Sequence, residues 1–220
     1  MSRKSVVLLG LVSLMSAVSG CSKSSMETTP APTTPAVETA KMPQMTEEQM
    51  MEAFKKANQL GENHKLLASF AGEWNTKVKS YTDPKSPPKE TKGSVSVKPI
   101  MGGRFLESNF KGSMMGMPFQ GRELSGFDNT SGKFVSAWID TMSTNIFQST
   151  GTYNPETKQF NYSGTVVCPV TKENVPVRMV ITVPDKNHHK FEWFEKRGEQ
   201  EVLGMEIDYT RKGTKKVAKN

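Results

Sequence analysis

The chain has 220 residues, of which 35% are hydrophobic and 23% are charged, with a formal net charge of +7. This length is enough for one globular domain with appendages and excludes two full domains. A basic balance without a repeat of aromatic and basic residues does not indicate nucleic-acid binding, so we expect no nucleic-acid partner.

Residues 1–20 have the anatomy of an export signal. Arg3 and Lys4 give a basic start, and an apolar run with many small residues covers 6–18. The run is too short to remain as a membrane-spanning helix, so we expect a signal peptide that is removed. Because no acidic residue leaves with it, the remaining chain would carry 27 basic and 22 acidic residues.

The small residues Ser19 and Gly20 directly precede Cys21, an arrangement that resembles the lipobox of bacterial lipoproteins. The resemblance implies cleavage before Cys21 and a membrane anchor of lipid, palmitate included, on that residue. Several acyl chains are needed because one alone holds a protein only weakly in a bilayer. Ser22 follows in place of an aspartate, which by the sorting rule of Gram-negative bacteria implies the outer membrane, facing the periplasm. The alternative is a soluble secreted protein with an incidental cysteine.

A tether and a helix precede the folded domain. Residues 21–45 combine the cysteine with Ser, Thr, Pro and Ala and contain few apolar side chains. Such a segment cannot bury enough surface to offset its chain entropy, so we expect a disordered tether that spans ~25–30 Å. An amphipathic helix is predicted at 46–61, because Thr46 and Gln49 have capping-box spacing and Gly61 is placed to end it.

The hydrophobic period changes from helical to two at Trp74, after a short helical turn at 64–70. Turn-forming residues then recur at the ~8–12-residue spacing of an all-β fold. They predict strands at 73–81, 92–99, 104–111, 119–127, 133–141, 145–153, 158–167, 175–183, 189–197 and 201–211. No helical pattern separates these strands, which excludes a parallel α/β sheet. We expect a mainly β protein: one antiparallel closed barrel of about ten strands at 62–212, preceded by one or two short helices and followed by a basic tail at 213–220.

Several motifs of this region stand in an order that resembles a known bacterial family. They are His64-x-x-Leu67, Phe70-Ala71-Gly72-x-Trp74, Met101-Gly102-Gly103-Arg104-Phe105-Leu106-Glu107, Met114-Met115-Gly116-Met117-Pro118-Phe119, Gly126-x-Asp128-Asn129, Trp138-Ile139-Asp140 and Tyr209-Thr210-Arg211. The family is domain of unknown function 1579, and the resemblance covers about residues 62–212. It has no established activity, so the resemblance implies a module without naming a task.

A wider resemblance is to the calycins, which include lipocalins, fatty-acid-binding proteins and nitrobindins. In these a Gly-x-Trp on the first strand closes the barrel floor, and a basic residue of the last strand packs over the Trp. The resemblance implies these roles for Gly72-x-Trp74 and for Arg211. A guanidinium over an indole contributes ~0.5–2 kcal/mol and would join the first strand to the last.

The strands at 119–127 and 133–141 supply candidate ligand contacts. Phe134, Ser136, Trp138 and Asp140 share one face, and Gln120, Arg122, Leu124 and Gly126 share another. If both faces turn inward, a basic and an acidic group sit among aromatic side chains, which suits an amphipathic or carboxylated small molecule. Our candidate ligand-binding residues are Glu107, Met117, Arg122, Trp138 and Asp140. The alternative is a filled barrel in which such charged pairs are structural.

Catalytic and metal motifs are absent from the sequence, so we expect no enzyme, no metal and no cofactor. There is no Gly-x-Ser-x-Gly and no His-Glu-x-x-His. Met114, Met115, Met117 and Met142 have the soft donors that copper(I) prefers, but adaptable apolar packing explains methionine more simply. His188 and His189 are read as part of an exposed turn rather than as ligands.

These observations predict a lipid-anchored, periplasm-facing barrel that binds or carries a small apolar or amphipathic ligand. Its partners would be the membrane, through the N-terminal lipid, and the ligand. The alternative is a structural or interaction lipoprotein with a filled barrel, whose partners are proteins of the cell envelope.

Overall fold

The computed structural model describes residues 45–81 and 86–213. The helices are α1 (Glu47–Ala57) and α2 (Glu62–Ala68), and a short 3₁₀ turn, η1, covers Met101–Gly103. The strands are β1 (Gly72–Ser80), β2 (Lys89–Ile100), β3 (Phe105–Met114), β4 (Met117–Asp128), β5 (Lys133–Asp140), β6 (Phe147–Asn154), β7 (Gln159–Val167), β8 (Asn174–Asp185), β9 (His188–Arg197) and β10 (Gln200–Arg211). The predicted signal peptide, Cys21, the tether up to residue 44 and the tail from residue 214 lie outside the described residues.

The two helices begin at different signals. The Thr46 hydroxyl accepts from the Gln49 N–H at 3.2 Å, and the Gln49 side chain accepts from the Thr46 N–H at 2.9 Å, which is the predicted capping box. However, α1 ends at Ala57, before the predicted stop at Gly61. Gly61 instead precedes α2, where its N–H donates to His64 Nδ1 at 3.1 Å and so gains a partner at a helix start. In the described part of the chain, no helix has the length and hydrophobicity to cross a membrane.

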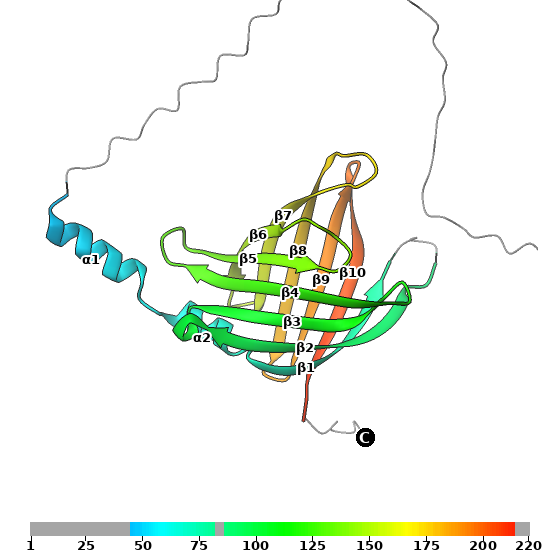
Figure 1. The fold of residues 1–220 in the computed structure, drawn as a ribbon, viewed down its shortest axis with the longest axis horizontal. Coiled ribbons are helices and arrows are strands. Elements are labelled where there is room, and N and C mark those ends of the chain that lie inside the picture. The colour runs from blue at the N-terminus through cyan, green and yellow to red at the C-terminus, as the bar shows by residue number, and fades with distance from the viewer. Residues whose placement is uncertain (1–44, 82–85, 214–220) are drawn as a thin grey trace, which may run out of the picture. The chain divides into compact units, whose positions relative to one another are not determined.

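The ten strands form the predicted closed antiparallel barrel. Each strand pairs with its neighbours in the chain, and β1 also pairs with β10, which closes the sheet. The closing register runs from Trp74 opposite Arg211 to Ser80 opposite Met205. In Figure 1 the strands β1–β5 cross in front of β6–β10, so the barrel has two curved walls. Closure satisfies the backbone groups that an edge strand would expose.

Alternating strand direction gives the barrel two distinct ends. The turns after the even-numbered strands β2, β4, β6 and β8 gather at the end where β1 begins and β10 finishes, which we call the floor. The turns after the odd-numbered strands gather at the opposite end, the mouth. Helix α2 contacts β3 and β4 and covers the floor side.

The turn after β3 is shorter than the gap between the predicted strands at 104–111 and 119–127. The strands β3 and β4 continue until Met114 pairs with Met117, leaving Met115 and Gly116 as a two-residue turn. Both turn residues have positive φ, 54° and 80°, as a tight hairpin that matches the strand twist requires. The methionines of this hairpin therefore divide between the core, against which Met114 packs, and solvent, where Met115 and Met117 are exposed.

Candidate functional site: the barrel interior

Trp74 and Arg211 close the floor, as the calycin resemblance implies. The Arg211 guanidinium carbon lies 4.1 Å from the centre of the Trp74 ring, and Trp74 is only 2% exposed. The indole N–H donates to the Phe70 carbonyl at 2.9 Å. Arg211 donates to the carbonyls of Ala71 at 2.6 Å and of Ser69 at 2.8 Å, which lie just before β1. The pair therefore joins the first strand, the last strand and the end of α2.

His189 lies inside the barrel above this floor, so the prediction that both histidines lie in an exposed turn is wrong for this one. Strand β9 begins at His188, which places the next side chain on the inward face. The His189 ring stacks on Tyr209 with centroids 4.1 Å apart and contacts Trp74 edge-on at 4.4 Å. Burial, helped by the charge of Arg211, lowers the pKa of His189 to about 3, so the ring is neutral at physiological pH.

His188 is the residue that fits the sequence prediction. Its exposed ring lies 3.0 Å from the Asp185 carboxylate. The hydrogen bond from the Asn187 N–H, followed by that from His188, holds the pKa of Asp185 below its usual range. Among the described residues, no three His, Cys, Asp or Glu side chains gather closely enough to hold a metal ion.

A row of polar side chains crosses the inner face of β3–β6. We call it the polar belt and define it as Ser108, Glu123, Ser136 and Ser149. Ser108 is the register partner of Glu123, and the Ser136 hydroxyl lies 2.8 Å from that of Ser149. Burial raises the pKa of Glu123 more than the hydroxyls of Ser136 and Ser108 lower it. The belt therefore centres on a carboxyl group that favours its protonated form.

Two tyrosines from other strands lie within electrostatic reach of this carboxyl. Burial, and after it the charge of Glu123, raises the pKa of both Tyr162 and Tyr209. Thr76 is the register partner of Tyr209, and its buried hydroxyl has no hydrogen-bond partner in the described residues. Polar groups thus face the interior from both walls of the barrel.

The middle of the barrel contains accessible surface. Glu123, Phe191 and Trp193 are only half-buried, although the first lies in the polar belt and the two aromatic rings pack against the core. A side chain that points inward from mid-strand is reached by water only from within. At the floor, in contrast, Trp74 and Phe160 are 2% and 1% exposed. The inward side chains are therefore fully buried at the floor and only half-buried between the polar belt and the mouth.

Two of the predicted ligand contacts, Trp138 and Asp140, face inward near the mouth. The Trp138 ring stacks on Phe119 with centroids 6.4 Å apart and lies over Gly121, where an added Cβ would come within 2.2 Å of the indole. The indole N–H donates to Asp140 at 2.8 Å, and the same carboxylate accepts from the Met142 N–H at 2.8 Å. Asp140 thus orients Trp138 and ties down the loop after β5.

The other three predicted contacts lie elsewhere. Arg122 and Glu107 are on the outer surface, with 3.7 Å between Arg122 Nε and a Glu107 oxygen, and the Arg122 side chain is 61% exposed. Met117 is exposed at the β3–β4 turn. The predicted inward face of β4 is wrong by one residue, because Gly121, not Arg122, pairs with Asp140. Glu123 was missed for that reason. Phe119 and Phe127 each lie an even number of residues from Glu123, so they mark its face of β4 as the apolar one.

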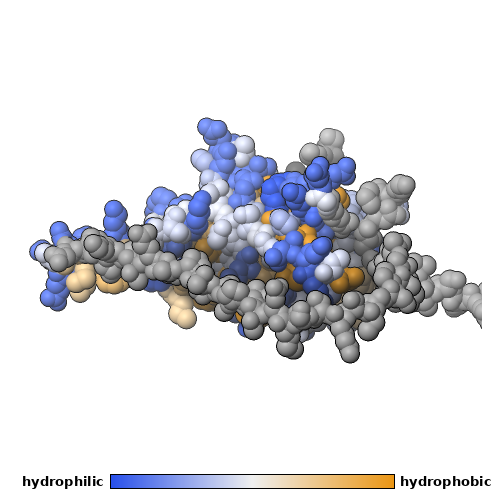
Figure 2. Space-filling model, turned by 90° about the horizontal axis from the view of Figure 1, so that it is seen from above, coloured by the Kyte–Doolittle hydropathy of each residue, from blue (hydrophilic) through white to orange (hydrophobic). Residues whose placement is uncertain are grey.

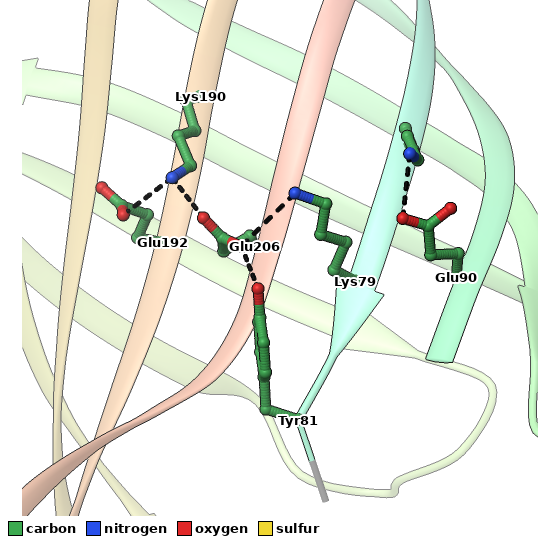
Figure 3. Close-up of polar contacts among 7 residues, drawn as sticks. Lys79, Tyr81, Glu90, Lys190, Glu192 and Glu206 are labelled. Carbon is green, nitrogen blue, oxygen red and sulfur yellow. Dashed lines mark hydrogen bonds and ion pairs between the residues drawn. The ribbon is translucent and has the colours of Figure 1, made fainter. Parts of the chain in front are cut away.

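A second cluster, of charged side chains, lies on the outer surface near the mouth and links β1, β9 and β10. Figure 3 shows Glu206 of β10 between Lys79 and Tyr81 on one side and Lys190 of β9 on the other. Glu206 is 8% exposed, and Lys190 also contacts Glu192 at 3.0 Å. These contacts cross the β1–β10 seam. The charged groups of this cluster pair with one another, which indicates a structural role.

A groove on the outside of the floor is the alternative site. It has a volume of about 270 Å³ and lies between the end of α1, α2 and strands β3–β5, with His64, Arg104 and Phe127 in its lining. The Asn129 amide crosses this region and donates to the carbonyls of Ala57 at 2.9 Å and Gln59 at 2.7 Å. The groove is open to solvent and smaller than most ligand pockets, so the interior is the stronger candidate. Figure 2, a view from above, shows hydrophilic residues over most of the face that it draws, with apolar residues between them.

Comparisons with known proteins agree with this architecture. The family model described as protein of unknown function (DUF1579) matches residues 59–211. The crystal structure of Rv2717c from M. tuberculosis is similar with a TM-score of 0.53 at 14% identity, covering 70% of this chain and 99% of that one. A redesigned β-barrel gives a TM-score of 0.34 at 12% identity, covering 66% of this chain and 93% of its own, which is too low to indicate a shared fold. No curated protein matches the sequence.

Proposed function

Because this chain belongs to the DUF1579 family of proteins of unknown function, its role must come from its own barrel, and we propose that the interior binds a small apolar or amphipathic molecule. The observation that carries the proposal is the half-buried inner surface of Glu123, Phe191 and Trp193. A concave apolar surface with a few polar groups is the usual form of a small-molecule site.

The two ends of the barrel give such a ligand one route. The floor is filled by Trp74 under Arg211. At the mouth, Met114 and Trp138 face inward and remain half-buried. A ligand would therefore enter past these two side chains and stop at the polar belt.

The same proposal includes the location of the protein in the cell. The lipobox-like residues before Cys21 support a lipid anchor, and the export signal supports a periplasm-facing position at the outer membrane. Cell-envelope proteins would be neighbours there. We take the protein to bind or carry its ligand and not to be an enzyme, because its sequence contains neither Gly-x-Ser-x-Gly nor His-Glu-x-x-His.

The second candidate is a structural lipoprotein with a filled barrel. It is favoured by the aromatic packing near the floor, where Phe134 is 2% exposed and contacts Phe160 edge-on with centroids 5.0 Å apart. This packing explains the lower part of the interior. It does not account for the half-buried surface at Glu123.

A fluorescence titration with the uncharged probe N-phenyl-1-naphthylamine tests the proposal. The full chain carrying Cys21→Ala keeps the barrel and avoids detergent. We expect saturable binding that Ser108→Phe, which fills the space beside Glu123, weakens by about tenfold or more, as a lost apolar contact of several carbons would. The matched control Lys111→Phe adds the same ring on the exposed side of β3 and should bind like the parent. No saturable binding, together with no co-purifying mass in native mass spectrometry, would refute a ligand-binding role.

A further inference from the structure

Helix α1 begins with a complete capping box, yet none of its residues is buried. It has 11 residues, and isolated helices shorter than ~12–15 residues are marginal in water. In proteins, most of the stability of such a helix comes from packing its apolar face against another surface. We therefore expect α1 to be covered by a surface outside the described chain.

The apolar side chains of α1 gather on one side of the helix. Met50, Phe54 and Ala57 recur at spacings of four and three residues, which places them on one face. This face is open to solvent, since Met50 is 42% exposed and Phe54 is 65% exposed. Glu52 and Lys55 lie on the other side, where their exposed charged groups are 3.9 Å apart. An apolar face opposite a charged one suits a boundary between water and an apolar medium.

The apolar face of α1 is too small to hold two protein molecules together. Even an aromatic side chain buries at most ~250 Å², and Met50 and Phe54 are already partly covered. A stable protein interface takes ~800 Å² from each partner. A bilayer sets no such requirement on a protein that is already anchored in it, because the anchor holds the helix at an effective concentration on the order of millimolar.

The position of α1 in the chain brings it close to that anchor. Residues 22–44 separate it from Cys21, and as the predicted flexible tether they would span only ~25–30 Å. The other end of α1 is attached to the barrel floor, because the Asn129 amide in the turn after β4 donates to the carbonyls of Ala57 and Gln59. A surface that covers α1 therefore lies beside the floor, and the mouth points away from it.

We propose that α1 lies on the surface of the bilayer in which Cys21 is anchored, with Met50 and Phe54 turned toward the acyl chains. This inference rests on the proposed lipid anchor and adds a second membrane contact, which holds the floor of the barrel against the bilayer. The contact is too small to keep the protein in the membrane without the anchor. Because α1 carries both acidic and basic side chains, the contact requires no anionic lipid.

Quenching by brominated lipid tests this placement. The full chain carrying Cys168→Ser, which removes the free thiol, is purified from membranes and reconstituted into phosphatidylcholine vesicles with bromine on the acyl chains. The fluorophore NBD on Met50→Cys should be quenched about twofold or more compared with NBD on Glu52→Cys, because the apolar face of such a helix enters the bilayer by ~5–10 Å. NBD on Met115→Cys, at the mouth, should remain unquenched. Adding Phe54→Glu should lower the quenching at position 50 to that at position 52 and leave the urea midpoint unchanged, since Phe54 is exposed.

The outcomes separate this inference from the proposed function. If the protein does not stay with the vesicles, the lipid anchor and the inference fall together. If it stays but positions 50 and 52 are quenched equally, the anchor stands and the placement of α1 is wrong. Quenching at position 115 would place the mouth on the bilayer and also overturn the inference. Disulfide-linked pairs of unlabelled Met50→Cys, without quenching at that position, would show that a second copy covers α1. Ligand binding in the interior is decided separately by the probe titration.

Discussion

Removing the Arg211 side chain should cost far more stability than its place at the end of the last strand suggests. The guanidinium lies 4.1 Å over Trp74 and donates to the Ala71 and Ser69 carbonyls. It also donates to the Lys186 carbonyl at 2.9 Å in the turn between β8 and β9. A cation–π contact of ~1 kcal/mol and hydrogen bonds of ~1 kcal/mol each give an expected loss of about 3–5 kcal/mol for Arg211→Ala.

Urea unfolding monitored by Trp fluorescence measures this loss directly. Arg178 offers a matched comparison, since its guanidinium also lies 4.0 Å over a ring, that of Phe194, and forms a 2.6 Å ion pair with Glu201. Its contacts lie on the outer surface, with 41% of the side chain exposed. Arg178→Ala should therefore cost about 1 kcal/mol or less. Equal losses for the two variants would show that Arg211 does not hold the floor, and the closure argument would be wrong.

The remaining predictions concern the floor glycine, two carboxyl groups and the anchor. Gly72→Ala should be strongly destabilising in thermal melts, because Gly72 has φ 133° and an added Cβ would lie 2.5 Å from Arg211 Nη1, whereas Gly61→Ala, with nothing within 4 Å, should be tolerated. Although burial opposes it, hydrogen bonds from Lys190 and Tyr81 keep the pKa of Glu206 low, so its contribution is present above the ordinary glutamate pKa and is lost on acidification. Glu206→Gln should therefore destabilise the protein at pH 7 and have a smaller effect at pH 3, as measured by urea unfolding; an equal effect at both values would refute the ion-pair account. For Glu123 the pH dependence of stability is reversed. Burial raises its pKa, so as the pH rises the unfolded chain loses this proton before the folded chain does, and folding becomes less favourable. Glu123→Gln should therefore raise Tm more at pH 8 than at pH 4. Cys21→Ala should move the protein from the membrane fraction to the soluble fraction, and retention in the membrane would contradict the lipobox interpretation.

The sequence contains the information for the strands and for the start of the first helix. Alternation with a period of two, broken by Gly, Pro, Asn and Asp, placed all ten strands within a few residues of their positions. The capping box at Thr46 was equally local, because its two hydrogen bonds join residues three apart. Signals of this kind need only neighbouring residues, so they can be read without a fold.

Predicting which residues form the site required the register between the strands. Arg122 and Glu123 are adjacent, and a shift of one residue exchanges an exposed guanidinium for an interior carboxyl. His189 was misplaced for a related reason, since the turn ends before His188 and β9 begins there, one residue earlier than the predicted strand at 189–197. The order of residues along the chain thus determined a closed barrel with Trp74 and Arg211 at its seam. Only the packing of each strand against its neighbours decided which side chains face the interior, because both faces of a strand are equally available until a partner fixes one of them.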